Sequence, residues 1–187
     1  MYFSGFCLKN DNELFSSLFK PNEYTVAGFS YGAQKALEYV LNCQTRVDKL
    51  ILFSPAFFQS STQSFIRAQM RYFGANHEQY IEQFYMNATH PADSSMITSY
   101  KSQGTAKELE ELLTYVWDIE KLKTIKTRGV GIEVFVGGMD KIVDTERCLE
   151  FFSKICTVYK IKNAGHLLLP HQVNTSVLRA SEIVRFG

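Results

Sequence analysis

The most informative segment of this chain is Val26-Ala27-Gly28-Phe29-Ser30-Tyr31-Gly32-Ala33, which fits the pattern Gly-x-Ser-x-Gly. A short β-rich run over residues 24–27 precedes the serine. An apolar stripe at helical spacing follows it, formed by Ala33, Ala36, Leu37, Val40 and Leu41. A strand that turns sharply into a helix lifts the hydroxyl of Ser30 clear of the sheet. Side chains at the flanking positions would collide with the neighbouring backbone, which explains Gly28 and Gly32. For a lone match of this kind, a turn built from small residues is the alternative.

The composition is that of an ordinary globular domain. The chain has 187 residues, of which 45% are hydrophobic and 21% charged, and this length fits one domain with a sizeable core. A net charge of +1 gives no reason to expect nucleic acid as a partner. Apolar runs are short, and the N-terminus lacks the pattern of a signal peptide. We expect a cytoplasmic protein without a membrane partner. Its cysteines are expected to be reduced and mostly buried, at Cys7, Cys43, Cys148 and Cys156.

Strand-like and helical patterns alternate along the chain, which is typical of a parallel sheet with helices on both faces. We therefore expect a minimal α/β fold with about five parallel strands, the first of them at an edge of the sheet. A helix that begins near Thr145 and is capped by Asp144 separates the last two strands. A closing helix is expected to carry Val173, Val177, Ala180 and Val184. The expected strands cover residues 1–3, 24–27, 49–53, 131–136 and 157–161.

The character of the sequence changes between about residues 57 and 128, where helical patterns occur without a convincing strand. We expect this insertion to form a helical lid over the carboxyl ends of the strands, within a single domain of residues 1–187. A helical pattern over residues 107–121 is the last of the insertion. Aromatic side chains of the lid are expected to line an apolar channel to Ser30, although core packing is an equal alternative for any single one. These residues are Phe57, Tyr72, Phe73, Phe84, Tyr85 and Trp117.

Two polar residues follow the ends of consecutive expected strands. Asp140 comes after the strand at 131–136, and His166 comes after the strand at 157–161. The carboxyl ends of parallel strands share one edge of the sheet with the turn that carries Ser30, so the three side chains can converge. Taken singly, Asp140 can be a turn residue and His166 can be a loop histidine. Their joint placement favours a shared site.

Such a site is suited to nucleophilic catalysis. A serine is a weak nucleophile until a base removes its proton, and the base must be held in one tautomer. His166 would accept the proton of Ser30 and later donate it to the leaving alcohol. Asp140 would accept a hydrogen bond from the other imidazole nitrogen and stabilise the imidazolium.

The same chemistry needs two backbone donors that point at the negative charge developing on the substrate. The N–H of Tyr31, directly after the serine, is one expected donor. The turn after the first strand should give the other, with the N–H of Phe6 as the first choice and that of Gly5 as the second.

With these residues in place, the chain resembles the α/β-hydrolase superfamily, whose members carry Ser, Asp and His in this order. The resemblance covers nearly all of the chain apart from a generic lid. Only about twenty residues separate the first strand from the strand before Ser30, so the superfamily's first two strands and its fourth, with that strand's helix, are expected to be absent. Besides the serine motif, the resemblance to this superfamily rests on two runs, Gly137-Gly138-Met139-Asp140-Lys141-Ile142-Val143 and Asn163-Ala164-Gly165-His166.

Within that superfamily the chain looks most like the pimeloyl-ACP methyl ester esterases of biotin synthesis, closest to the shortened type of Helicobacter-like bacteria. These enzymes hydrolyse the methyl ester at the far end of a pimeloyl chain carried by acyl carrier protein (ACP), without a cofactor or metal. The resemblance gives Ser30, Asp140 and His166 the roles of nucleophile, acid and base. It also places Phe6 and Tyr31 at the oxyanion and ester contacts, and Arg67 and Arg71 against the carrier's acidic surface and phosphate. Ser4-Gly5 replaces the usual His-Gly, which leaves the second oxyanion donor open.

Two other functions stay open at this point. A general short-chain carboxylesterase or an acyl thioesterase would use the same three residues, since they do not distinguish oxygen esters from sulfur esters. A non-catalytic binding protein with a hydrolase fold is a different class. An intact set of Ser30, Asp140 and His166 argues against it, because a receptor has no need of all three.

Overall fold

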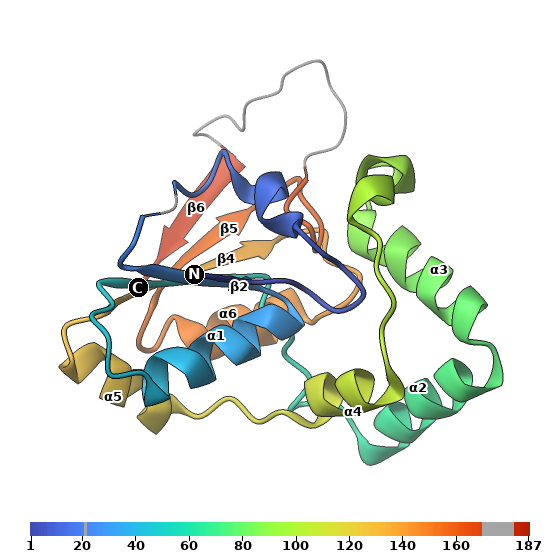
Figure 1. Cartoon of the computed structure of the whole chain (residues 1–187), viewed down its shortest axis with the longest axis horizontal. Helices are drawn as coiled ribbons and strands as arrows, with labels where there is room; N and C mark the ends of the chain where they lie inside the picture. Colours follow the sequence, from blue (N-terminus) through green and yellow to red (C-terminus); the bar gives the residue numbers. More distant parts are fainter. Residues whose placement is uncertain (21, 170–181) are drawn as a thin grey trace.

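A six-stranded sheet lies at the centre of the molecule, and its strands follow one another in the order of the sequence. The computed structural model describes residues 1–20, 22–169 and 182–187. The first five strands are parallel, and the sixth runs antiparallel to the fifth (Figure 1). The α/β class, the five parallel strands and the place of the first strand at one edge are confirmed. The strands are β1 (Tyr2–Phe3), β2 (Thr25–Phe29), β3 (Lys49–Phe53), β4 (Gly131–Gly137), β5 (Thr157–Ile161) and β6 (Ile183–Phe186).

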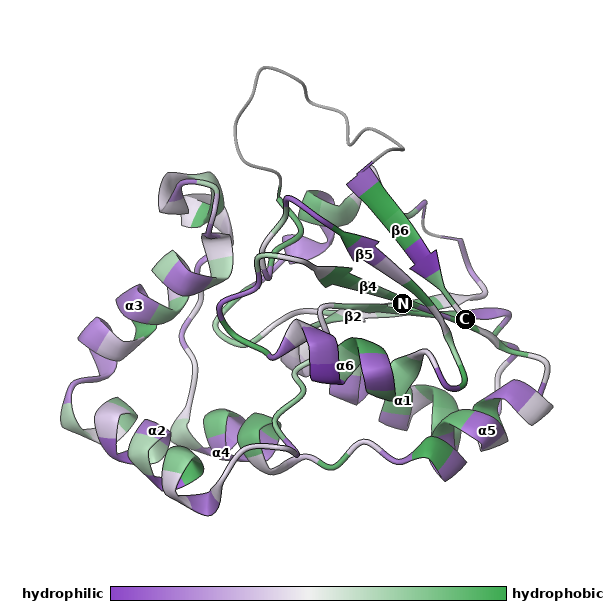
Figure 2. Cartoon of the chain, turned by 180° about the vertical axis from the view of Figure 1, so that it is seen from behind, coloured by the Kyte–Doolittle hydropathy of each residue, from purple (hydrophilic) through white to green (hydrophobic). Residues whose placement is uncertain are grey.

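Three α-helices lie on one side of the sheet: α1 (Tyr31–Asn42), α5 (Ile119–Thr127) and α6 (Thr145–Phe152) (Figure 1). Successive side chains of a strand point to opposite faces, so every second strand residue enters this layer. Figure 2 shows that β4 and most of β6 are hydrophobic. Asp144 caps α6 by accepting the backbone N–H of Arg147 (3.1 Å), as the sequence predicts. The buried layer includes Val26, Leu37, Leu50, Leu52, Leu122, Val134 and Phe152.

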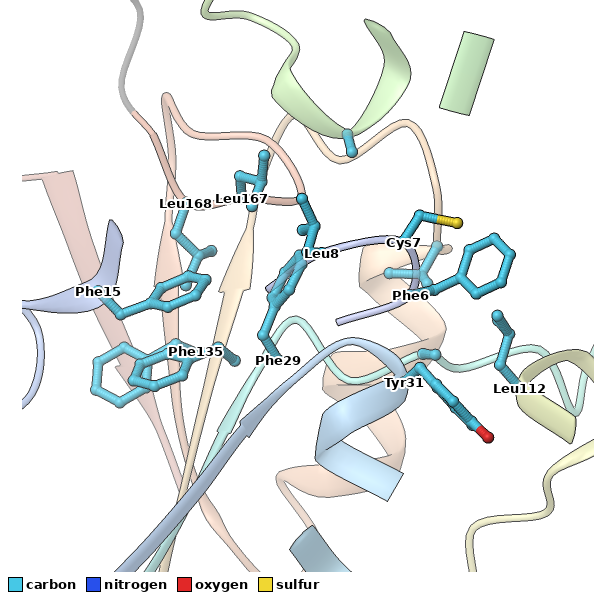
Figure 3. Packing of buried hydrophobic residues seen from close by; sticks show 14 of the residues in the cluster. Phe6, Cys7, Leu8, Phe15, Phe29, Tyr31, Leu112, Phe135, Leu167 and Leu168 are labelled. Carbon is cyan, nitrogen blue, oxygen red and sulfur yellow. The ribbon is translucent and has the colours of Figure 1, made fainter. Parts of the chain in front are cut away.

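The opposite face of the sheet is covered by a short 3₁₀-helix, η1 (Asp11–Phe15), and by the chain that follows β5. The ring of Phe15 stacks on that of Phe53, with ring centroids 4.4 Å apart and planes at 9°. Stacking of this kind adds to the free energy gained by burying the two rings. Figure 3 shows the side chains packed here, among them Leu8, Phe15, Phe29, Phe135, Leu167 and Leu168.

The C-terminal segment differs from the sequence prediction. Val184, expected on a closing helix, lies in β6 and pairs with Lys160 of β5. The four residues 183–186 include β-branched and aromatic side chains that favour a strand, and β5 has a free edge whose N–H and C=O groups need partners. The other residues expected on that helix, Val173, Val177 and Ala180, lie outside the described residues.

The chain between β3 and β4 is mostly helical, and its helices α2, α3 and α4 lie beside the carboxyl ends of the strands (Figure 1). The predicted helix over residues 107–121 is two helices, because α4 ends at Thr114 and Asp118 caps a new helix, α5. α5 packs beside α1 under the sheet rather than with the preceding helices. No helix among the described residues is long and apolar enough to cross a membrane. We call the remaining elements the helical cover: α2 (Gln63–Ala75), α3 (His77–Thr89), η2 (Ser94–Tyr100) and α4 (Ala106–Thr114).

Candidate active site

Ser30 lies at the sharp turn between β2 and α1. Its backbone dihedrals, φ 53° and ψ −113°, are rarely adopted by L-residues, and such strain persists only where the surroundings fix it. The Ser30 N–H donates to the carbonyl of Phe53 (2.9 Å), which anchors the turn to β3. A Cβ on Gly28 would lie 2.2 Å from the Gly32 carbonyl oxygen, so the turn leaves no room for a side chain there. The predicted sharp turn from strand to helix is therefore present.

The structure brings Ser30, His166 and Asp140 together at the carboxyl ends of the strands. His166 Nε2 lies 2.9 Å from Ser30 Oγ, and His166 Nδ1 lies 2.7 Å from Asp140 Oδ2. Asp140 Oδ1 accepts the backbone N–H groups of Ile142 (2.7 Å) and Val143 (3.1 Å). The side chains of His166 and Asp140 are fully buried. A carboxylate held on both oxygens fixes the imidazole with its proton on Nδ1, so that Nε2 can accept the proton of Ser30.

The loop that carries His166 is held from two sides. Leu167 N–H donates to the carbonyl of Ala88 (3.1 Å) near the end of α3. The imidazole packs against the ring of Phe29 in β2, with centroids 5.0 Å apart. The position of the histidine therefore depends on both the sheet and the helical cover.

Two backbone N–H groups beside Ser30 have no hydrogen-bond partner in the described part of the chain, those of Phe6 and Tyr31. Both were predicted as oxyanion donors, and both N–H groups are free to serve as such. Gly5, the second choice, is wrong as a donor. Its N–H already donates to Asp11 Oδ2 (3.0 Å) and cannot also bind a substrate oxygen.

Asp11 is a site residue that the sequence does not mark, because it lies within the uniformly polar run Lys9-Asn10-Asp11-Asn12. In the structure its side chain is fully buried, and Oδ2 accepts both the Gly5 N–H and the Tyr2 hydroxyl (3.2 Å). Burial and the nearby Asp11 raise the pKa of Tyr2 above its ordinary value, so the phenol stays protonated and donates. Asp11 thereby fixes the peptide that leads into Phe6.

A cavity of about 240 Å³ lies between Ser30 and the helical cover. Phe6 and Ser30 line it from the sheet side, and Figure 3 shows the ring of Phe6 beside Leu112 of α4. Its polar lining residues are Gln69, Tyr80, Gln83, Asn87 and Lys141. Its other apolar lining residues are Phe58, Phe65, Phe84, Leu109, Leu112, Leu113 and Ile142. The hydroxyl of Ser30 thus faces a largely apolar space, which suits an acyl chain.

Of the six aromatic residues predicted to line a channel to Ser30, Phe84 alone lines this cavity. Phe57 and Trp117 pack on the far face of the sheet, Phe73 and Tyr85 are buried in the cluster beneath the cover, and Tyr72 is 54% exposed. Helical spacing shows which residues share a face, but it does not show what that face packs against. The prediction missed the aromatic residues that do line the cavity, namely Phe6, Phe58, Phe65 and Tyr80.

Polar contacts join α4 to the helix that follows Ser30. The hydroxyl of Tyr31 donates to Glu111, and Figure 3 shows the phenol extending from the start of α1 toward α4. Gln34 Nε2 donates to the carbonyls of Ala56 (2.9 Å) and Leu112 (3.0 Å). Burial and the hydrogen bond to Glu111 raise the pKa of Tyr31, so its hydroxyl remains a donor. The partners lie 80 and 78 residues apart in sequence, and no local pattern signals such pairs.

Arg67 and Arg71 lie on α2, and both are exposed. Phe65 and Gln69 line the cavity, and two residues further along an α-helix the direction turns by about 200°. The arginines therefore lie on the side of α2 away from the cavity. Neither forms an ion pair with another residue of the described ranges, and Arg71 Cζ lies 5.3 Å from the ring centre of Tyr72.

Metal-ligating side chains do not cluster near the site. Within residues 1–20, 22–169 and 182–187, no three His, Cys, Asp or Glu side chains lie close enough to share an ion. The cysteines are free thiols, buried at Cys7, Cys148 and Cys156 and partly exposed at Cys43.

Neither a protein-family model nor a curated protein sequence matches this chain. Solved structures do match. The esterase EaEST from Exiguobacterium antarcticum aligns with a TM-score of 0.60 and 18% identity, over 83% of this chain and 63% of its own. The chain spans about three fifths of the length of EaEST and of carboxylesterase CesB from Bacillus subtilis.

Two shorter structures match over most of their length. BioG from Haemophilus influenzae aligns with a TM-score of 0.57 and 13% identity, over 89% of this chain and 87% of its own. MenH from S. aureus aligns with a TM-score of 0.59 and 14% identity, over 88% and 85%. The chain therefore has the α/β-hydrolase fold, and at these identities the likeness shows the fold alone.

Proposed function

We propose that this chain is a serine hydrolase that cleaves carboxylic esters. The observation that carries the proposal is the buried series of hydrogen bonds from Asp140 through His166 to Ser30. It ends at a cavity whose lining is mostly apolar. Two uncommitted N–H groups, those of Phe6 and Tyr31, lie next to it. A binding protein would need neither a strained serine nor a buried carboxylate to orient a histidine.

In the proposed reaction, His166 Nε2 takes the proton of Ser30 as Oγ attacks the carbonyl carbon of the ester. The carbonyl oxygen becomes negatively charged and accepts the N–H groups of Phe6 and Tyr31. Protonated His166 then gives its proton to the departing alcohol, and an acyl ester remains on Ser30. Water repeats the sequence and releases the carboxylic acid, while Asp140 stabilises the imidazolium in both halves.

We further propose that the substrate is the methyl ester of pimeloyl-ACP, which would be converted to pimeloyl-ACP and methanol for biotin synthesis. The resemblance of the motifs around Ser30, Asp140 and His166 to pimeloyl-ACP methyl ester esterases supports this choice. The mostly apolar lining of the cavity beside Ser30 also suits the acyl chain of such a substrate.

A substrate panel with Ser30→Ala tests the proposal. The panel should contain methyl pimeloyl-ACP, simple methyl and p-nitrophenyl esters, and an acyl thioester, with methanol and free thiol measured as separate products. We expect methanol release from the carrier-linked ester and labelling of Ser30 by a fluorophosphonate. In Ser30→Ala, turnover should fall by about 10³-fold or more, since the three residues act as a unit. Near-normal turnover of Ser30→Ala would refute the hydrolase. Release of thiol rather than methanol would indicate a thioesterase, and a preference for the simple esters would indicate a general carboxylesterase.

The carrier part of the proposal predicts a role for Arg67 and Arg71, whose exposed side chains are free to meet an acidic protein. Reversal of both to Glu should raise KM for methyl pimeloyl-ACP and leave turnover of small esters unchanged. The wild-type advantage should shrink as salt increases, because exposed charges are screened. A control reverses two other exposed cations, Lys123 on α5 and Lys154 just after α6, which pair with Glu120 and Glu150 nearby. Equal effects of the two double variants would contradict specific carrier binding by the arginines.

A further inference from the structure

A second cavity, of about 480 Å³, lies between α2 and α3 and continues the one at Ser30. The two cavities share four lining residues: Gln69, Tyr80, Gln83 and Asn87. We call this second cavity the amide groove. All of its lining residues are uncharged, and most carry a carboxamide or a phenol: Gln69, Tyr72, Ala75, Asn76, Gln79, Tyr80, Gln83 and Asn87.

The groove and the cavity at Ser30 form one continuous path whose two parts differ in the polarity of their lining residues. Near Ser30 the lining is aromatic and aliphatic, whereas between α2 and α3 it is polar and neutral. Figure 2 shows α3 as a mostly hydrophilic helix. Tyr80, Gln83 and Asn87 follow one another at helical spacing, which aligns them along about 10 Å of one side of α3. An extended chain that left the cavity at Ser30 would run along this row.

The shared residues keep free hydrogen-bonding groups. Tyr80 OH donates to Gln69 Oε1 (2.9 Å), which leaves the amide nitrogen of Gln69 without a partner in the described chain. Gln83 Nε2 donates to Asn87 Oδ1 (3.1 Å), which leaves an oxygen on Gln83 and a nitrogen on Asn87 likewise free. Exchanging the O and N positions of this pair would again leave one acceptor and one donor. A secondary amide of a ligand presents the complementary set, one N–H and one C=O.

The groove stays neutral at physiological pH. Burial raises the pKa of Tyr80 to about 12, so its phenol is protonated. One cation lies against the lining residue Tyr72, since Arg71 Cζ is 5.3 Å from the ring centre of this exposed tyrosine. A neutral chain can therefore lie in the groove and still end beside a positive charge.

We propose that the amide groove binds an uncharged linear arm with secondary amides, joined to the acyl chain whose ester reaches Ser30. The pantetheine arm of a carrier protein has this chemistry. This inference rests on the proposed esterase activity and deepens it, because it assigns the recognition of the arm to Gln69, Gln83 and Asn87.

The test compares three methyl esters of the same length at the reacting end. They are the methyl pimeloyl thioester of pantetheine, dimethyl pimelate without an amide, and the methyl pimeloyl amide of diglycine, whose amides are spaced as in a peptide. Methanol release is measured with the wild type, with Gln83→Leu and with Gln83→Leu/Asn87→Leu. Gln63→Leu is the matched control, since Gln63 lies on α2 outside both cavities.

We expect the wild type to favour the pantetheine ester, and the double variant to lower its kcat/KM by about 10- to 100-fold, the effect of two lost hydrogen bonds. The double variant should lower turnover of dimethyl pimelate by at least about tenfold less than turnover of the pantetheine ester, because dimethyl pimelate has no amide to bind. Gln63→Leu should leave turnover of both esters within about twofold of the wild type. Equal losses on the pantetheine ester and dimethyl pimelate, or none on either, would overturn the assignment of the groove while leaving the esterase in place. A preference for the diglycine ester would replace the pantetheine arm with a peptide. Absence of methanol release from all three esters in the wild type would instead refute the proposed function.

Discussion

Asp140→Asn is the most informative single perturbation of the site, because the structure determines how the new amide must lie. Asp140 Oδ1 accepts two backbone N–H groups, from Ile142 and Val143, while Oδ2 accepts His166 Nδ1–H. An asparagine side chain has one acceptor oxygen, and this oxygen will accept the N–H groups of Ile142 and Val143. Its NH₂ group must then face His166 Nδ1, which becomes an acceptor. The imidazole proton moves to Nε2, and Nε2 can no longer take the proton of Ser30.

The size of the effect follows from the same contacts. The reverse amide orientation would leave two partly buried N–H groups unpaired, at a cost of up to about 1–3 kcal/mol each. That cost holds the asparagine in the harmful orientation. A histidine held in the wrong tautomer loses about 10⁴-fold in kcat. The free energy of unfolding should change little, since Asn keeps the shape and most of the hydrogen bonds of Asp140.

The assay is the steady-state hydrolysis of a p-nitrophenyl ester, together with the rate at which a fluorophosphonate labels Ser30. Both rates should fall together, because both need the nucleophile to lose its proton. Asp144→Asn is the matched control. Asp144 caps α6 by accepting the N–H of Arg147, and Asn caps helices equally well. A kcat for Asp140→Asn within about tenfold of the wild type would refute the tautomer argument.

Two further substitutions test how the turns around Ser30 are built. Asp11→Ala should lower kcat by about 10- to 100-fold with little change in KM, because the loop before the Phe6 donor loses the carboxylate that holds it. Asp11→Asn keeps an acceptor for the Gly5 N–H and should restore most of the activity. Gly32→Ala should abolish folding or lower Tm sharply, since its Cβ would lie 2.1 Å from a carbonyl oxygen of β1. Gly74→Ala is the control, because the space around Gly74 is open, and its Tm should be unchanged or raised. Comparable Tm values for the two variants would contradict the packing argument.

The sheet and the convergence of Ser30, Asp140 and His166 could be predicted from the sequence because both follow from local patterns. The strand at residues 49–53 is a short, mainly apolar run, and the strand at 157–161 is a short run rich in β-branched and aromatic residues; their bounds are those of β3 and β5. Once the sheet is known to be parallel, the residues after its strands must share one edge. Ser30, Asp140 and His166 could therefore be placed together without any knowledge of side-chain contacts.

The features that could not be predicted depend on which distant segment a residue meets. Trp117 fits a helical stripe, but it packs under the sheet against Phe152 because the chain breaks between α4 and α5. Gly5 has the expected position for an oxyanion donor, but its N–H is taken by the carboxylate of Asp11. In both cases the position along the chain was predicted correctly, but the role of the residue depends on a contact with a segment that the local sequence does not identify.

The helical cover is hydrogen-bonded to the residues that follow Ser30 and His166 in the chain. Tyr31, whose N–H is the proposed oxyanion donor, holds Glu111 of α4 through its hydroxyl. Leu167, next to His166, holds the carbonyl of Ala88 in α3 through its N–H. A displacement of α4 would therefore move the Tyr31 donor, and a displacement of α3 would move the proposed base, His166. In the proposed reaction the reacting side chains come from the ends of the strands, and the cover supplies most of the lining of the two cavities. A substrate that fills the space between α2 and α3 would stabilise the same helices that hold the donor and the base. Binding of the proposed pantetheine arm should therefore raise kcat as well as lower KM.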